Sequence, residues 1–289
     1  MDFKNAAELL TLCEKEKCPI SEIMKRRECD LAETTMEKVE ARMRKALSIM
    51  RKSSSEPLTS PRRSMGGLLG GEAQLVERHR QEGKSVCGNV LSRAVAYAMG
   101  VLEVNSSMGL IVAAPTAGSS GVVPGVFLAL QKEHGSSDEE LLAALYNSSA
   151  VGFLAMRNAS VAGAVGGCQA EVGVASAMAA SGAVELMGGT PAQCLDAAST
   201  ALMNLLGLVC DPVGGLVEYP CQYRNAIGVA NALTAAELAL SGVKQLIPFD
   251  EMLSAMYHVG RRLAPEFKET AMGGCATTPS GCKACQGCG

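Results

Sequence analysis

The chain has 289 residues, of which 48% are hydrophobic and 19% charged, and its formal net charge is -3. This length is enough for one large domain or two modest ones with a buried core. The mildly negative charge excludes the basic surface that phosphate backbones require, so we expect no nucleic-acid partner. No secretion signal opens the sequence, so the 12 Cys are expected in a reducing cytoplasm, where thiols bind metals more often than they form crosslinks.

The N-terminal part of the chain carries a large share of the charge. Asn5 is expected to cap a first helix, and Pro19 suits the first turn of a second, whose apolar residues recur at helical spacing. We interpret residues 1–52 as a charged N-terminal helical segment that covers the rest. Residues 53–63 contain two Pro and five Ser or Thr, the composition of a linker.

Residues 64–274 are predicted to form the catalytic domain. They open with a glycine-dense turn at 64–72, ahead of a helical stretch at 73–81. The turn lacks the Gly-Lys-Ser/Thr ending of a phosphate-binding loop. Close backbone packing and a contact with substrate both remain open as explanations of its glycines.

A stretch without charge follows at residues 104–131, and residues 110–114 are its best strand candidate. We predict no membrane span here, because the Pro and Gly near its middle would leave backbone groups unsatisfied in a bilayer. Instead, residues 116–121 are expected to form a buried loop that ends at a helix N-terminus. Thr116, Gly118 and Ser119 are therefore candidates to hold a substrate carboxylate.

Later helices are signalled by their capping residues. Ser137 with Glu140, and Thr190 with Gln193, fit capping boxes. Ala-rich segments such as residues 171–186 and 197–208 carry little charge and are expected to be buried on most sides. We therefore predict a mainly α fold, a compact bundle of Ala-rich helices joined by irregular loops containing Gly and Pro.

Three of these loops contain Cys, at positions 168, 210 and 221. Any one of them could be a small buried hydrophobe. Each, however, lies near Gly or Pro and near polar residues that are otherwise scarce in this half of the chain. Arg224 and Asn225 are among these neighbours, and they either support a metal site or form a structural pair unrelated to it.

Four motifs closely resemble the alpha chain of the iron-sulfur-dependent L-serine dehydratases. They are APTAG at 114–118, GCQAEVG at 167–173, CDPVGG at 210–215 and PCQYRNAI at 220–227. They occur in order, within a resemblance that runs from about residue 64 to residue 275. One position, Ala117, is Asn in some members of the family, so a side-chain contact there is not expected.

The resemblance implies a 4Fe-4S cluster held by Cys168, Cys210 and Cys221. Three thiolates leave one iron open as a Lewis acid for loss of the serine hydroxyl, and the products would be pyruvate and ammonia without pyridoxal phosphate. The family also implies a beta chain or domain, which we expect as a separate subunit because no such region precedes residue 1. That chain is expected to supply the general base, since His79, His134 and His258 adjoin none of the motifs.

Residues 275–289 form a Cys-rich tail with Cys275, Cys282, Cys285 and Cys288. It could be a mobile thiol tail, a structural or redox metal site, or a segment that visits the active site. An electron-transfer or thiol-redox protein centred on this tail is therefore the main alternative function. The exact substrate range and the oligomeric state are left open by the sequence.

Overall fold

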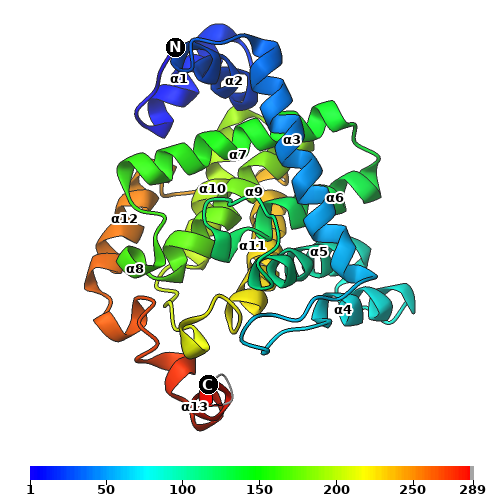
Figure 1. Cartoon of the computed structure of the whole chain (residues 1–289). Helices are drawn as coiled ribbons and strands as arrows, with labels where there is room; N and C mark the ends of the chain where they lie inside the picture. Colours follow the sequence, from blue (N-terminus) through cyan, green and yellow to red (C-terminus); the bar gives the residue numbers. More distant parts are fainter. Residues whose placement is uncertain (287–289) are drawn as a thin grey trace.

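The computed structural model describes residues 1–286, and in this part of the chain helices are joined by irregular loops, with no β-strand. This confirms the predicted mainly α fold. Figure 1 shows the N-terminus and the last helix at opposite ends of the molecule. The helices are α1 (Ala6–Glu16), α2 (Ile20–Leu31), α3 (Met36–Ser55), α4 (Glu72–Gln81), α5 (Gly88–Ser106), α6 (Val122–His134), α7 (Asp138–Asn158), α8 (Gly163–Gly166), α9 (Val174–Leu186), α10 (Pro191–Asn204), α11 (Cys221–Leu240), α12 (Phe249–Arg262) and α13 (Pro279–Gln286).

Helix α9 forms the centre of the bundle and packs against α6, α7, α10 and α11. All its residues from 174 to 184 are buried, and most of them are small. Small side chains let the helix backbones approach one another closely. A Cβ atom on Gly182 would lie 2.4 Å from the Phe127 ring and 2.7 Å from the Ala144 carbonyl oxygen. The run of small, uncharged residues from 174 to 184 therefore suits a closely packed core.

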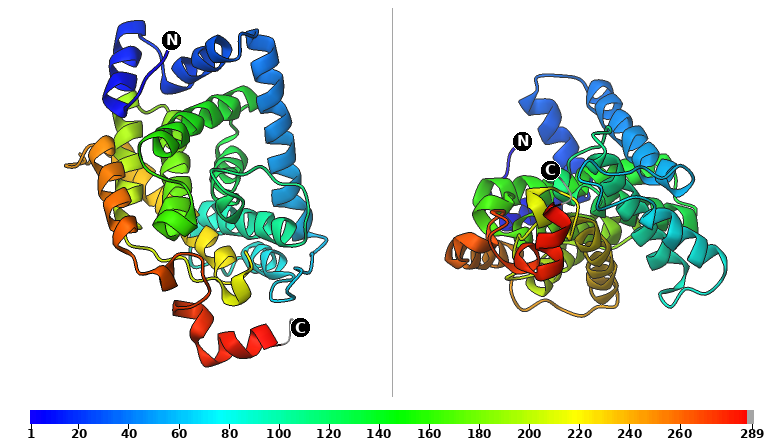
Figure 2. Two further views of the ribbon diagram at one scale, coloured as in Figure 1. Left: turned by 60° about the vertical axis from the view of Figure 1, so that its left-hand side comes forward. Right: turned by 60° about the horizontal axis from the view of Figure 1, so that its bottom comes forward.

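Helices α1 to α3 cover one end and one side of this core, as both views in Figure 2 show. Arg27 of α2 is only 6% exposed, and its guanidinium carbon lies 3.7 Å from the ring centroid of Phe153 on α7. On α3, Arg51 Nη1 donates a hydrogen bond of 2.8 Å to Asp138 at the start of α7. Two Arg side chains, as well as apolar residues, therefore hold the charged N-terminal segment against the core.

The local signals for helix starts are confirmed. Glu140 N–H donates to Ser137 Oγ at 3.2 Å while Ser137 N–H donates to the Glu140 carboxylate at 2.7 Å, and Thr190 with Gln193 forms the second predicted capping box. Asn5 caps α1 as expected. Within residues 1–286, no helix combines the length and the apolar character needed to cross a membrane.

Two local expectations require correction. Helix α3 continues through Ser55, with Ser53 and Ser54 buried, so the division placed after residue 52 falls inside a helix. The strand expected at residues 110–114 is wrong, because this segment is irregular chain that leads to a cis bond before Pro115. Its neighbours are helical, so an apolar run there has no extended partner to complete a ladder.

Candidate functional site

Two of the three Cys singled out by the motifs lie at the starts of helical elements. Cys168 precedes a π-helix, η3 (Gln169–Gly173), which continues into α9, and Cys221 is the first residue of α11. Cys210 lies beyond the end of α10 and forms an isolated parallel β-bridge with Lys268. Cys168 and Cys210 are 4% and 3% exposed, and Cys221 is half-buried.

Burial is the main electrostatic influence on the three thiols. Burial raises the pKa of Cys168 to about 11 and that of Cys221 to about 12, and it also raises the pKa of Cys210. Charge on the neighbouring Cys residues adds to the rise for Cys210 and Cys221, whereas Arg224 acts in the opposite direction on Cys168 and Cys221. At neutral pH these thiols are therefore protonated, and a cationic centre would be needed to ionise them.

Glu171 lies between these thiols and the loop at residues 116–121. Its Oε1 accepts a 2.8 Å hydrogen bond from Thr116 Oγ1, and its Oε2 accepts one of 3.8 Å from Cys210 Sγ. A Cβ atom on Gly163 would stand 2.5 Å from Oε2, so a larger residue there would displace this carboxyl group. Burial raises the pKa of Glu171, and the Thr116 bond opposes that rise.

The predicted carboxylate loop is present and contains a short 3-10 helix, η2 (Ala117–Ser119), directly before α6. Thr116 and Ser119 form a reciprocal cap across it. Ser119 is fully buried, and its Oγ donates to the Ala114 carbonyl at 3.3 Å. Thr116 is the member of the pair whose hydroxyl faces Glu171, and Ser119 holds the shape of the loop.

Asn225, in the first turn of α11, ties this loop to a thiol segment. Its side-chain amide donates to the carbonyl oxygens of Gly118 at 2.7 Å and Cys221 at 2.9 Å. Its Oδ1 accepts the Gly121 N–H at 3.0 Å. Asn225 is fully buried, so all three bonds are shielded from water.

Arg224 secures the chain on both sides of Cys210. Its guanidinium donates to the Val209 carbonyl and forms an ion pair with Asp211, which is 3% exposed. The other oxygen of Asp211 accepts the Cys275 N–H at 2.7 Å. Arg224 thus connects the Cys210 segment to α11, and Asp211 connects the same segment to the start of the C-terminal tail.

The glycine-dense turn wraps around another buried carboxylate, that of Glu218. This side chain is 2% exposed and accepts hydrogen bonds from Ser64 Oγ at 2.6 Å, Gly66 N–H at 2.6 Å and Leu68 N–H at 3.1 Å. A Cβ atom on Gly66 would lie 2.6 Å from the Leu216 side chain and 2.9 Å from Glu218, which is the close packing expected as one explanation of these glycines. The turn fixes the segment that leads into Cys221.

The C-terminal tail is folded over the same region as far as residue 286. Helix α13 packs against η4 (Val213–Gly215), just beyond Cys210. A Cβ atom on Gly214 would lie 3.3 Å from Cys285 Sγ, and Cys282 Sγ donates to the Ala276 carbonyl at 3.6 Å. Cys288 lies outside the described residues.

The three His lie away from this arrangement. His79 is on α4, His134 ends α6, and His258 is on α12, where its Nδ1 contacts the Ser254 carbonyl oxygen at 2.7 Å. No contact between these side chains and the three thiols occurs among the described residues.

In residues 1–286, no group of three or more His, Cys, Asp and Glu side chains could hold one metal ion. An iron-sulfur cluster has a different requirement, because each thiolate binds a separate iron and the ligands surround the cluster from several sides. Cys168 and Cys210 are buried, Cys221 is half-buried, and the three come from separate segments. Arg224 opposes the burial-driven rise in the pKa of Cys168 and Cys221 and so favours their thiolates.

Residues 15–276 match the protein-family model described as serine dehydratase alpha chain. The chain therefore belongs to the serine dehydratase alpha-chain family, as the motifs predicted.

Two similar relatives have nearly the same length. A probable L-serine dehydratase alpha chain of Bacillus subtilis strain 168 is 43% identical over 279 residues, covering 96% of this chain and 93% of the relative. The L-serine dehydratase alpha chain of Peptoniphilus asaccharolyticus is 41% identical over 281 residues, 97% of this chain and 96% of the relative. The L-serine dehydratase of Helicobacter pylori strain J99 is longer: it is 38% identical over 287 residues, 96% of this chain but 62% of the relative.

Two acidic residues have roles that sequence reasoning missed. Glu171 belongs to a quoted motif, but its contact with Thr116 joins positions 55 residues apart. Glu218 accepts hydrogen bonds from a turn about 150 residues earlier. Both are acidic residues in a region with few charges, and this could have drawn attention to them in the sequence. A buried carboxylate in such a region needs specific hydrogen-bond donors.

Proposed function

We propose that the chain is the alpha subunit of an enzyme that converts L-serine to pyruvate and ammonia, with a 4Fe-4S cluster on Cys168, Cys210 and Cys221. The observation that carries the proposal is the contact of Glu171 with both Cys210 and Thr116, which joins a Cys-containing family motif to the loop at residues 116–121. The names of the relatives support L-serine as the substrate.

When bound, the cluster would supply an iron without a protein ligand, a Lewis acid for departure of the β-hydroxyl group. Thr116 and the backbone at Gly118 would bind the substrate carboxylate, with Ser119 maintaining the loop. A substrate held there faces the Glu171 carboxyl group. Loss of the α-proton and of the β-hydroxide, which together amount to one water, leaves aminoacrylate; this tautomerises to the imine, and a water molecule hydrolyses the imine to pyruvate and ammonia.

The residues around the thiols orient them. Arg224 holds the chain on both sides of Cys210, and Asn225 bonds to the Cys221 backbone. Both therefore support the cluster ligands without contacting substrate, which is the role proposed for them.

A beta chain completes the enzyme in this proposal. The matched family and two similar relatives are named as alpha chains, and a longer relative has sequence beyond the matched region. Because the three His lie away from the thiols, the general base is assigned to that partner. A cytoplasmic location fits the 11 described Cys, all of which are free thiols.

The test is anaerobic reconstitution of the chain with its beta chain, followed by iron and sulfide analysis and a pyruvate assay with L-serine. Cys210→Ala is expected to lower bound iron and abolish turnover. Cys194→Ala, a matched change at a fully buried Cys on α10, should preserve both. Normal iron and turnover in Cys210→Ala would overturn the ligand assignment.

The redox alternative gives a different result. If the tail carried the function, changing Cys282 and Cys285 together to Ser would remove the metal, whereas the proposed site would keep its cluster. This double change is preferable to truncation after residue 272, because the backbone of Cys275 bonds to Asp211 and so supports the Cys210 segment.

A further inference from the structure

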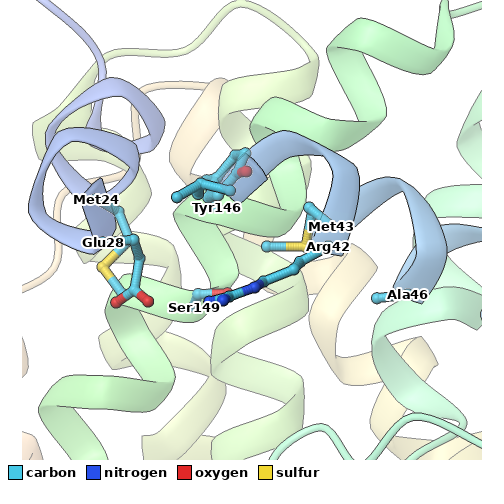
Figure 3. Close-up of a pocket in the computed structure, with 8 residues that line it drawn as sticks. Met24, Glu28, Arg42, Met43, Ala46, Tyr146 and Ser149 are labelled. Atoms are coloured by element: carbon cyan, nitrogen blue, oxygen red, sulfur yellow. The ribbon is translucent and has the colours of Figure 1, made fainter. Parts of the chain in front are cut away.

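A second candidate site lies between α2, α3 and α7, at the end of the molecule opposite α13 (Figures 1 and 3). These helices enclose a cavity of about 270 Å³. Its apolar lining includes Met24 of α2 and Val39 and Met43 of α3. The volume suits a molecule of amino-acid size with a hydrophobic part.

Two opposite charges line the same cavity. Glu28 projects from α2 and Arg42 from α3, and Figure 3 shows the Arg42 side chain extended from α3 toward the side where Glu28 lies. They do not pair with each other. Glu28 has only a long contact with Arg27, at 3.4 Å, and Arg42 forms no ion pair within residues 1–286. Both charges are therefore available to a ligand that carries the opposite charges itself.

Tyr146 of α7 adds an unsatisfied polar group. Its side chain lines the cavity and is 3% exposed, yet its buried hydroxyl has no hydrogen-bond partner among the described residues. Tyr146 also lines an adjoining cavity of about 240 Å³ that contains Lys25 and Glu40. Buried hydroxyl groups are rarely left without a partner, because the lost bond to water is costly.

We propose that this cavity binds a free α-amino acid with an apolar side chain. Arg42 binds the carboxylate, Glu28 binds the ammonium group, and Tyr146 donates its hydroxyl hydrogen to the ligand. The side chain packs on the methionines. A site with one cation and one anion favours a zwitterion over a phosphate ester or a polyamine. A phosphate ester would be repelled by Glu28, and a polyamine would be repelled by Arg42.

The test is calorimetric titration of the full chain with L-leucine, compared with 4-methylpentanoate and isoamylamine, each of which lacks one of its charges. Leucine is expected to bind at least about tenfold more tightly than either analogue. Arg42→Gln and Tyr146→Phe should each weaken leucine binding, the former by about tenfold. Lys45→Gln, a matched change at an exposed position of α3 outside the cavity, should leave it unchanged.

Two outcomes would overturn the proposal: no leucine binding up to about 10 mM, or binding that Arg42→Gln and Glu28→Gln leave unaltered. A third opposing result would be that both analogues bind as tightly as leucine, because the site would then recognise only apolar surface. The readout involves no iron and no turnover, so its failure is separate from failure of the proposed dehydratase function.

Discussion

Asn225 offers a direct test of how the carboxylate loop is held against the Cys221 segment. Replacement by Ala removes three buried hydrogen bonds, to Gly118, Gly121 and Cys221. At about 1 kcal/mol each, their loss is expected to lower the free energy of unfolding by about 3 kcal/mol. Asn225→Asp should be worse, because it keeps the acceptor for Gly121 but turns a carboxylate toward two carbonyl oxygens.

The measurement is urea unfolding of the full chain under reducing conditions, followed by far-ultraviolet circular dichroism because the chain has no Trp. Asn204→Ala is the control, since this exposed helical Asn makes a single side-chain bond, to Asn231 at 2.8 Å. It should cost less than about 1 kcal/mol. An Asn225→Ala variant as stable as the control would refute the idea that this residue ties the two segments together.

Three further changes have defined outcomes. Burial raises the pKa of Glu185 in the folded chain above its ordinary 4.5, so this residue ionises at a lower pH in the unfolded chain than in the folded one. As the pH rises above 4.5, the free energy of unfolding of the wild type should therefore fall relative to that of Glu185→Gln. Urea midpoints of the two proteins that change in parallel between about pH 4 and 8 would contradict this. Glu218→Gln places an amide N–H₂ against the hydrogen-bond donors of the glycine-dense turn, and we expect the free energy of unfolding to fall by about 1–3 kcal/mol. Amide hydrogen exchange in residues 64–69 should become faster. Unchanged exchange would count against the idea that Glu218 holds this turn. Gly163→Ala pushes a methyl group onto Glu171 and should reduce iron retained after reconstitution, so full iron content would be the opposing result.

Elements with local causes could be predicted from the sequence. The caps at Ser137 and Thr190 depend on side chains three residues away, and both formed as expected. The identity of the three Cys segments came from motif order. The distances between these segments depend on how three separate parts of the chain pack, and the spacing along the sequence does not predict them.

Errors and omissions arose where tertiary contacts override composition. Ser53 and Ser54 look like linker residues, but burial against the core keeps them helical. Glu171 and Glu218 acquire their roles from partners far away in sequence. Residues 110–114 have strand-like side chains and yet no extended neighbour.

Cys210 depends on a distant part of the chain for its own backbone position. Its N–H donates to the Phe267 carbonyl at 2.9 Å, and its carbonyl accepts the Glu269 N–H at 2.9 Å. During synthesis, these partners leave the ribosome nearly 60 residues after Cys210 does, and Cys275, which anchors Asp211, follows later still. The Cys210 segment therefore reaches its final shape only after residues 267–275 have been synthesised, so the proposed cluster would enter a chain that is already made at least that far.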